Sequence, residues 1–196
     1  IIASLSITSA SFKLVAPDMK LEFILCVYVL PLCPSIALRR AVSLEISSDK
    51  LLVIAENCKN VPENSPSTFW ESIQMVWFIH LVIQIESNGH SASLGRVDQY
   101  LYEYYKKDVL EDKVISKEFA KELLQCLWVK LYTIIKVRPT SHSGYGAGYP
   151  TYQNVTIGGS NYDGSDSCNE LTYLILESVA ENKLTQPNLA VRFHSN

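Results

Sequence analysis

The C-terminal part of the chain carries the pattern that most constrains the fold, namely a strand, a helix and a second strand in close succession. Residues 152–157 (YQNVTI) read as a strand that stops at Gly158-Gly159. A helix of roughly 15 residues follows, and we expect Ser167 and Glu170 to form the capping box at its start. Residues 189–193 (LAVRF) form the second strand. Such a unit implies parallel strands and a right-handed crossover, so the sequence predicts an α/β fold.

Three helices are predicted upstream of this unit. Thr68 and Glu71 have capping-box spacing, and the helix that they open, residues 69–86, is apolar on nearly all sides and therefore expected to be buried. A tyrosine-rich helix starts near Asp98. Ser116 can cap a third helix, whose apolar stripe consists of Phe119, Leu123, Leu127, Leu131 and Ile134. The loop at residues 138–150 is expected to lack regular structure.

Charge and cysteine content exclude several classes of protein. The chain has 17 basic and 20 acidic residues among 196, a net charge of −3, which argues against nucleic acid as a partner. Its five cysteines cannot all pair, and no Cys-x-x-Cys or Cys/His ladder is present. We therefore expect no metal site, and we expect reduced thiols in a cytoplasmic protein. Gly-rich phosphate-binding motifs are also absent from the sequence.

Residues 1–40 differ in character from the rest. They are Ser-rich and apolar, and residues 21–38 are apolar apart from Glu22 and Ser35 and are broken by Pro31 and Pro34. Three interpretations stay open for residues 21–38: a membrane helix, a buried core segment, or a product of a frame error or foreign sequence. We expect an atypical segment at 1–40 and a folded domain at 41–196. Both ends of the chain read as cut.

His90 is the most informative single residue. It lies in a polar loop, residues 86–91 (ESNGHS), directly after the apolar helix, so that an imidazole and the Ser91 hydroxyl stand together at the mouth of an apolar core. Such a pair can hold a hydroxyl-bearing substrate or move a proton near neutral pH. A histidine that only ends the helix is the alternative. Arg96 and Asp98 suggest a local salt bridge or a helix N-cap, and His80 suggests a core histidine.

Several blocks in one order resemble the glycyl radical enzymes, the family of pyruvate formate-lyase and glycerol dehydratase. They are residues 68–74 (TFWESIQ), 86–91 (ESNGHS), 94–102 (LGRVDQYLY), 148–150 (GYP), 153–159 (QNVTIGG), 169–174 (NELTYL) and 186–192 (QPNLAVR). The resemblance covers roughly residues 41–196. It implies an incomplete piece of the family's ten-stranded α/β barrel, helix-rich and built around a buried radical site.

The resemblance also implies a chemistry. In the family, an activating enzyme that uses S-adenosylmethionine and an iron–sulfur cluster installs a glycyl radical, which generates a thiyl radical on a cysteine. The diol and glycerol dehydratase branch implies that His90 accepts a substrate hydroxyl proton and that Ser91 holds the hydroxyl. Asn88, Arg96 and Asp98 would have supporting roles. A small diol substrate and a homodimer of the full-length parent are implied as well.

The chain also departs from the family. We expect the radical-bearing glycine, and the thiyl cysteine with its Cys-x-Glu motif, to be absent from this chain, and Cys168 stands where the family usually has Thr. The chain alone is therefore predicted to be inactive. Alternatives are a truncated, non-catalytic remnant or interaction module, a pyruvate formate-lyase-type acyltransferase fragment, and a protein tethered to a membrane by residues 21–38.

Overall fold

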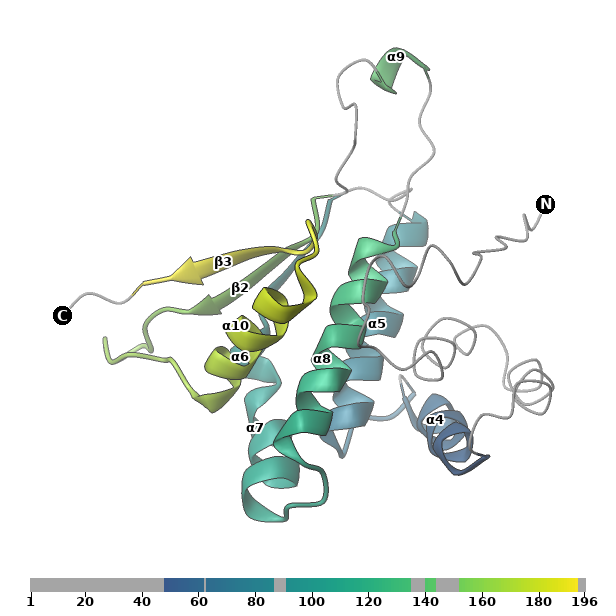
Figure 1. Cartoon of the computed structure of the whole chain (residues 1–196), viewed down its shortest axis with the longest axis vertical. Coiled ribbons are helices and arrows are strands. Elements are labelled where there is room, and N and C mark those ends of the chain that lie inside the picture. Colours follow the sequence, from purple (N-terminus) through teal and green to yellow (C-terminus); the bar gives the residue numbers. More distant parts are fainter. Residues whose placement is uncertain (1–47, 62, 87–90, 135–139, 144–151, 194–196) are drawn as a thin grey trace.

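The computed structural model describes residues 48–61, 63–86, 91–134, 140–143 and 152–193 (Figure 1). The expected division at residue 40 and the three interpretations of residues 21–38 fall outside these ranges. The elements are α4 (Ser48–Asn60), α5 (Phe69–Glu86), β1 (Ser93–Arg96), α6 (Val97–Tyr100), α7 (Tyr102–Tyr105), the π-helix η2 (Lys106–Glu111), α8 (Lys117–Tyr132), α9 (Thr140–Ser143), β2 (Asn154–Gly158), α10 (Glu170–Asn182) and β3 (Asn188–Arg192).

The three strands form one parallel sheet in the order β1-β2-β3. Asn154 pairs with Asn188 and Ile157 with Val191, so β2 and β3 run in register along their whole length. The predicted strand–helix–strand unit with parallel strands is confirmed. β1 was not predicted, because its four residues, Ser-Leu-Gly-Arg, show no alternation.

Helices cover one face of the sheet (Figure 1). α10 packs on α8, and α8 packs on α5, so the helices succeed one another away from the strands. Val155 and Ile157 point to the helices and are fully buried. The apolar stripe predicted for α8 is confirmed at three positions, Leu123, Leu127 and Leu131, each at most 2% exposed.

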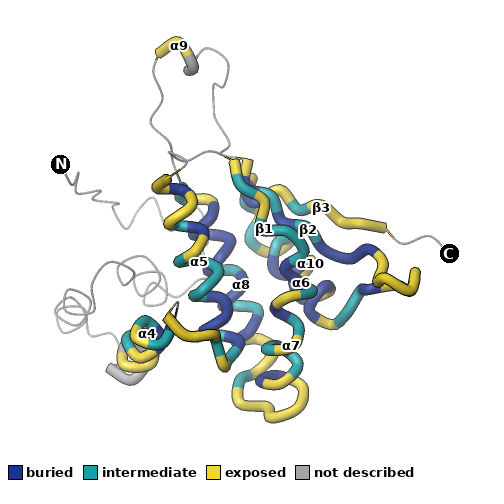
Figure 2. The backbone as a smooth tube through the Cα atoms, turned by 180° about the vertical axis from the view of Figure 1, so that it is seen from behind, coloured by how far each residue is buried: buried dark blue, intermediate teal, exposed yellow. Residues whose placement is uncertain are grey.

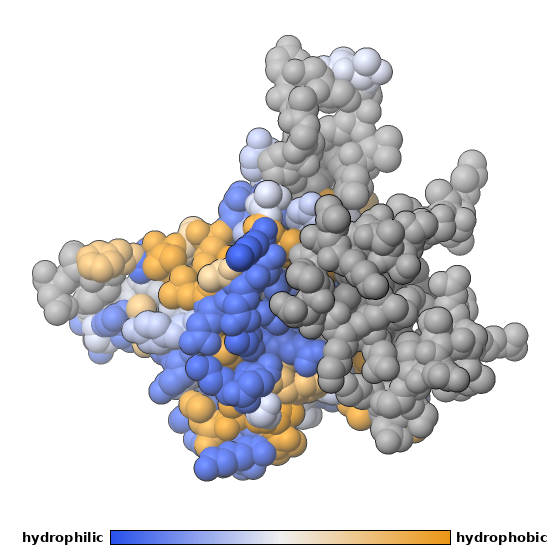
Figure 3. Space-filling model, in the orientation of Figure 1, coloured by the Kyte–Doolittle hydropathy of each residue, from blue (hydrophilic) through white to orange (hydrophobic). Residues whose placement is uncertain are grey.

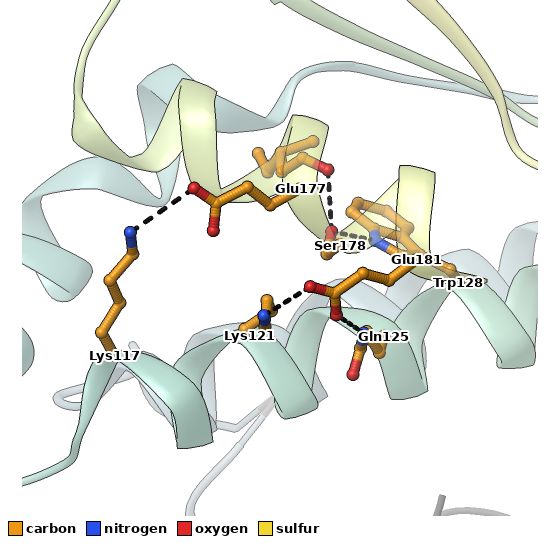
Figure 4. A network of polar contacts seen from close by, with 8 residues as sticks. Lys117, Lys121, Gln125, Trp128, Glu177, Ser178 and Glu181 are labelled. Carbon is orange, nitrogen blue, oxygen red and sulfur yellow. Dashed lines mark hydrogen bonds and ion pairs between the residues drawn. The ribbon is translucent and has the colours of Figure 1, made fainter. Parts of the chain in front are cut away.

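Polar contacts line the seam between α8 and α10 (Figure 4). Trp128 Nε1 donates a 2.7 Å hydrogen bond to Ser178 Oγ inside the core. At the solvent edge, Lys121 Nζ lies 2.7 Å from Glu181 Oε1. Because both contacts join the same two helices, they fix the register of α10 on α8.

The N-terminus of α5 is closed as the sequence predicts. Glu71 N donates to Thr68 Oγ1 at 3.1 Å and Thr68 N donates to Glu71 Oε2 at 3.3 Å, which is the reciprocal capping box. The first helical N–H, that of Phe69, donates to Asp108 Oδ2 at 2.7 Å. Asp108 comes from η2, so the tyrosine-rich helical segment holds the start of α5.

Two local predictions were wrong. The helix α10 begins with Asn169 as N-cap and Thr172 as its reciprocal partner, not with Ser167 and Glu170, because the Ser167 hydroxyl is held by Gly159 O and by Arg96. The loop expected at residues 138–150 contains the short helix α9 at Thr140–Ser143. Ser116 does cap α8, where its Oγ accepts from Phe119 N at 3.1 Å.

The prediction that α5 is buried on all sides was also wrong. Four apolar residues of its C-terminal half, Ile79, Val82, Ile83 and Ile85, are exposed by 46–70%. Its buried positions include Glu71, Ser72, His80 and Gln84, all polar. Figure 2 shows α5 lying against α8. The polar residues face inward because each finds a specific partner there, and the apolar face is left outward.

Exposed apolar side chains also gather over β3. Val191 and Phe193 are 56% and 88% exposed. Figure 3 shows this orange patch beside the blue, polar surface of α10. Within the described ranges, no helix is both long enough and apolar enough to cross a membrane.

Candidate functional site

The predicted site lies where the chain passes from α5 to β1. Ser91 is exposed and stands two residues before β1. Asn88 and His90 lie outside the described residues, so the pairing of imidazole and hydroxyl stays a prediction.

The chain is hydrogen-bonded to the start of β2 both before and after this loop. Before it, Gln84 Nε2 of α5 donates to Gln153 Oε1 at 3.5 Å. After it, Asn154 N donates to Ala92 O at 3.0 Å. Gln153 and Asn154 are adjacent at the start of β2. The segment that carries Ser91 is therefore held at both ends by one place in the sheet, and we call these two contacts the bracket.

Gln153 is the centre of this bracket. Its side chain is fully buried, its N–H donates to Gln186 Oε1 at 2.9 Å, and its carbonyl accepts from Asn188 N at 2.8 Å. Thus α5, β2 and the start of β3 meet at one residue. Gln153 was not predicted as a site residue, because nothing in its local pattern shows that it is buried.

His80 lies beside Gln153 on the inner side of α5. It is 2% exposed, and burial lowers its pKa against the opposing effect of a hydrogen bond with Gln153. The imidazole is therefore neutral near pH 7, and the expected core histidine is confirmed. His80 Nε2, Gln84 Oε1 and Gln153 Nε2 have no hydrogen-bond partner among the described residues. Buried water molecules are the usual partners of such atoms.

The face of the sheet away from the helices is polar next to this loop. Side chains alternate along a strand, so Asn154 lies opposite to the buried Val155. Its registered neighbours are Ser93 on β1 and Asn188 on β3, and they share its face. Ser93, Asn154 and Asn188 thus form an uncharged row, which we call the amide row, across the N-terminal edge of the sheet. Parallel sheets are ordinarily covered on both faces, and the described elements cover only the helical face.

Arg96 and Asp98 lie at the other end of β1 from Ser91, and the four-residue strand separates them by about 13 Å. Neither local role foreseen for them is present. Arg96 makes no side-chain cap bond to α6 and instead contacts Ser160 O and Ser167 Oγ.

Asp98 is completely buried and joins three elements. Its Oδ2 accepts from Gly158 N and from Thr172 Oγ1, both at 2.7 Å, and its carbonyl accepts from Asn169 Nδ2 at 2.9 Å. The structure therefore gives Asp98 contacts with the end of β2 and the start of α10, and it does not bring Asp98 to Ser91.

Cys168 requires a correction to the motif reading. A Cys-x-Glu motif was predicted to be absent, but Cys168-Asn169-Glu170 has that spacing. The thiol is partly buried, and a hydrogen bond with Asp166 raises its pKa, so it is protonated at neutral pH. It precedes α10, beyond the end of β2 that is farther from Ser91. The structure therefore does not bring Cys168 to the Ser91 loop.

Two further features bear on binding. A hollow of about 510 Å³ lies beside the loop, between α5 and residues 92–104, and its lining is mostly apolar, with Ile79, Ile83 and Leu94 among its walls. Within the described ranges, no group of three or more His, Cys, Asp or Glu side chains is placed to hold a metal ion.

Comparison with known proteins gives a consistent family. Residues 36–196 match the family described as pyruvate formate lyase-like. The chain is 51% identical over 154 residues to the probable dehydratase YbiW of Escherichia coli (strain K12), covering 77% of this chain and 19% of the relative. It is 42% identical over 149 residues to an isethionate sulfite-lyase of Nitratidesulfovibrio vulgaris, covering 74% of this chain and 18% of that protein.

Solved structures agree with these relatives. A structure concerned with 1,2-propanediol dehydration in Roseburia inulinivorans matches with a TM-score of 0.76 and 40% identity, over 82% of this chain and 19% of that one. The glycerol-bound B12-independent glycerol dehydratase from Clostridium butyricum matches with a TM-score of 0.76 and 39% identity, over 87% of this chain and 21% of that one. The chain thus spans about a fifth of the length of the proteins that it matches.

Proposed function

Because the chain belongs to the pyruvate formate lyase-like family of glycyl radical enzymes, we propose that it supplies the hydroxyl-holding part of a dehydratase that acts on a small diol. Fold and family do not by themselves name a substrate, so the proposal rests on the site. The observation that carries it is the bracket at Gln153 and Asn154, which fixes the chain on both sides of the loop with His90 and Ser91.

The two loop side chains would divide the work. The Ser91 hydroxyl both donates and accepts hydrogen bonds, so it can hold a substrate hydroxyl in one orientation. His90 would accept the proton of a substrate hydroxyl, and a second acid from outside this chain would protonate the departing hydroxyl group. A neutral imidazole is the competent form of His90 for this step.

The rest of the machinery would lie outside this chain. Hydrogen abstraction from the substrate carbon would come from a thiyl cysteine and a glycyl radical, neither of which we place among residues 1–196. An activating enzyme that uses S-adenosylmethionine would install the radical, and the full-length parent would form a homodimer. We therefore propose that the 196-residue chain alone has no dehydratase activity.

A chimeric enzyme tests the role of the loop. Residues 41–196 would replace the matching part of the Clostridium butyricum glycerol dehydratase, and the activated chimera would be assayed with glycerol. We expect His90→Ala to lower kcat at least about 100-fold and Ser91→Ala to raise KM about tenfold. Ser165→Ala, in the exposed loop after β2, is the matched control and should leave both constants unchanged. Unchanged glycerol turnover by the His90→Ala chimera would refute the proposed role.

A further inference from the structure

The amide row contains a pair of side chains with unused hydrogen-bond donors. Asn188 Nδ2 donates to Asn154 Oδ1 at 3.3 Å, and Gln186 Nε2 lies 3.5 Å from Asn188 Oδ1. Both amide oxygens of the pair are thus engaged. Among the described residues, no acceptor is bonded to Asn154 Nδ2, which carries two N–H donors. Each amide oxygen of the pair already accepts one bond, and Asn154 Nδ2 therefore offers unused donors on the side of the sheet away from the described helices.

The pair also lies next to the loop that carries Ser91. Asn154 N donates to Ala92 O, one residue after Ser91. The two segments therefore run side by side at the strand spacing of about 4.8 Å. Ser93, the registered partner of Asn154, continues the row on the loop side. A ligand oxygen within reach of Asn154 Nδ2 would belong to the same small molecule as a hydroxyl held by Ser91.

The absence of charged side chains in the amide row favours a neutral ligand oxygen over an anionic one. Amide N–H groups are uncharged donors, and the row contains no cationic side chain. Arg192 is on the same face, but it pairs with Gly158, four residues along β3 from Asn188, or about 13 Å away. An anionic oxygen desolvated at the row would have no opposite charge beside it, whereas a hydroxyl oxygen needs only a donor.

We propose that Asn154 and Asn188 form a subsite for a second, uncharged hydroxyl of the substrate, beside the hydroxyl held by Ser91. This inference rests on the proposed function and narrows it: the site takes a neutral diol or triol in preference to a hydroxy-sulfonate such as isethionate. Asn154 donates to the second hydroxyl, and Asn188 orients the Asn154 amide by bonding its oxygen.

Isosteric substitution tests the subsite in the activated chimera. Asn154→Asp keeps the shape of the side chain but removes both N–H donors and adds a negative charge. We expect the KM for glycerol to rise about tenfold or more while kcat changes less than about threefold. Asn188→Leu should raise KM by a smaller factor, because it only frees the orientation of Asn154. Asn161→Asp, in the exposed loop after β2, is the matched control and should leave KM unchanged.

The outcomes separate this inference from the one before it. If His90→Ala abolishes turnover while Asn154→Asp keeps the KM for glycerol, the subsite is wrong and the loop proposal stands. If isethionate competes with glycerol more strongly than 1,2-propanediol does, the predicted preference for a neutral ligand is wrong. The KM is compared only between variants whose thermal midpoints agree with that of the parent chimera. If Asn154→Asp fails this check, Asn154→Ser takes its place.

Discussion

The carboxylate of Asp98 holds the end of a strand that lies 60 residues away, since its Oδ2 accepts the backbone N–H of Gly158 at 2.7 Å. The same oxygen accepts from Thr172, on the first turn of α10. One buried side chain thus sets the exit of β2 against the entry of α10, and the polar loop between them, residues 159–169, has both ends fixed.

Asp98→Asn tests this connection. Both hydrogen bonds end on one oxygen, Oδ2, so an Asn side chain can keep them only through its amide oxygen, and they then lose their charge assistance. We expect the free energy of unfolding to fall by about 2–3 kcal/mol. Urea denaturation followed by circular dichroism measures it. Asp112→Asn, at an exposed position after η2, should change it by less than about 0.5 kcal/mol; equal effects of the two substitutions would contradict the role of Asp98.

Gly158 and Gly164 form a matched pair of left-handed glycines. Their φ angles are +70° and +83°, but a Cβ on Gly158 would lie 2.9 Å from Arg192 O, whereas one on Gly164 would have no heavy atom within 4 Å. Gly164→Ala should cost only the backbone strain, about 1 kcal/mol. Gly158→Ala should cost at least about 2 kcal/mol more, because β3 must shift. Thermal midpoints of the two variants measure the difference, which would vanish if the strands could separate freely.

The seam between α8 and α10 allows a buried and an exposed contact to be compared. Ser178 is fully buried, and its Oγ accepts from Trp128 Nε1, so Ser178→Ala leaves the indole N–H without a partner and should cost about 1–2 kcal/mol. Glu181→Gln breaks the ion pair with Lys121. The side chains of Lys121 and Glu181 are 25% and 51% exposed, so this change should cost under about 0.5 kcal/mol. Chemical denaturation measures the free energy of unfolding of both variants. A larger loss in Glu181→Gln than in Ser178→Ala would contradict the greater weight given to the buried contact.

Lys130 predicts a pH dependence. It is 4% exposed, lies over the Trp77 ring at 5.0 Å, and burial lowers its pKa to about 7. Between about pH 7 and 10.5 the unfolded chain binds more protons than the folded one, so stability rises with pH in that window. Lys130→Met should remove this part of the rise and should stabilise the protein at pH 7 by on the order of 1 kcal/mol.

The control for this prediction is Lys59→Met, in which the lost side chain is 68% exposed. That variant should keep the pH dependence of the parent. Thermal midpoints across pH 7 to 10 give both curves. A Lys130→Met curve parallel to that of the parent would show that Lys130 is charged throughout the range.

Local signals predicted much of the fold correctly. The capping box at Thr68 and Glu71, the cap at Ser116 and the strand–helix–strand order are each written in a few consecutive residues, and the structure contains all three. The cap of α10 was misplaced because Ser167 and Asn169 are both good N-cap residues. The choice between them depends on Arg96 and Gly159, which engage Ser167.

The orientation of α5 and the bracket around the Ser91 loop could not be predicted in this way. A helix with apolar residues on every side has no hydrophobic period to orient it, so its rotation is set by where its few polar side chains find partners. Gln84 meets Gln153, 69 residues on, and Glu71 accepts from Asn60 of another helix, α4, so these partners lie on other elements. The same holds for Asp98, whose sequence neighbour Arg96 suggested a local pairing that the fold replaces.

The parallel sheet has a consequence for handling the protein. β1 and β3 are its outer strands, so along each side the peptide groups that point outward have no further strand within the described ranges. Such edge strands readily pair with another extended segment, and the exposed Val191 and Phe193 also make the β3 margin hydrophobic. Concentrated solutions of the isolated chain should therefore form filaments or precipitate through this margin, and a lysine at Val191 should delay that process.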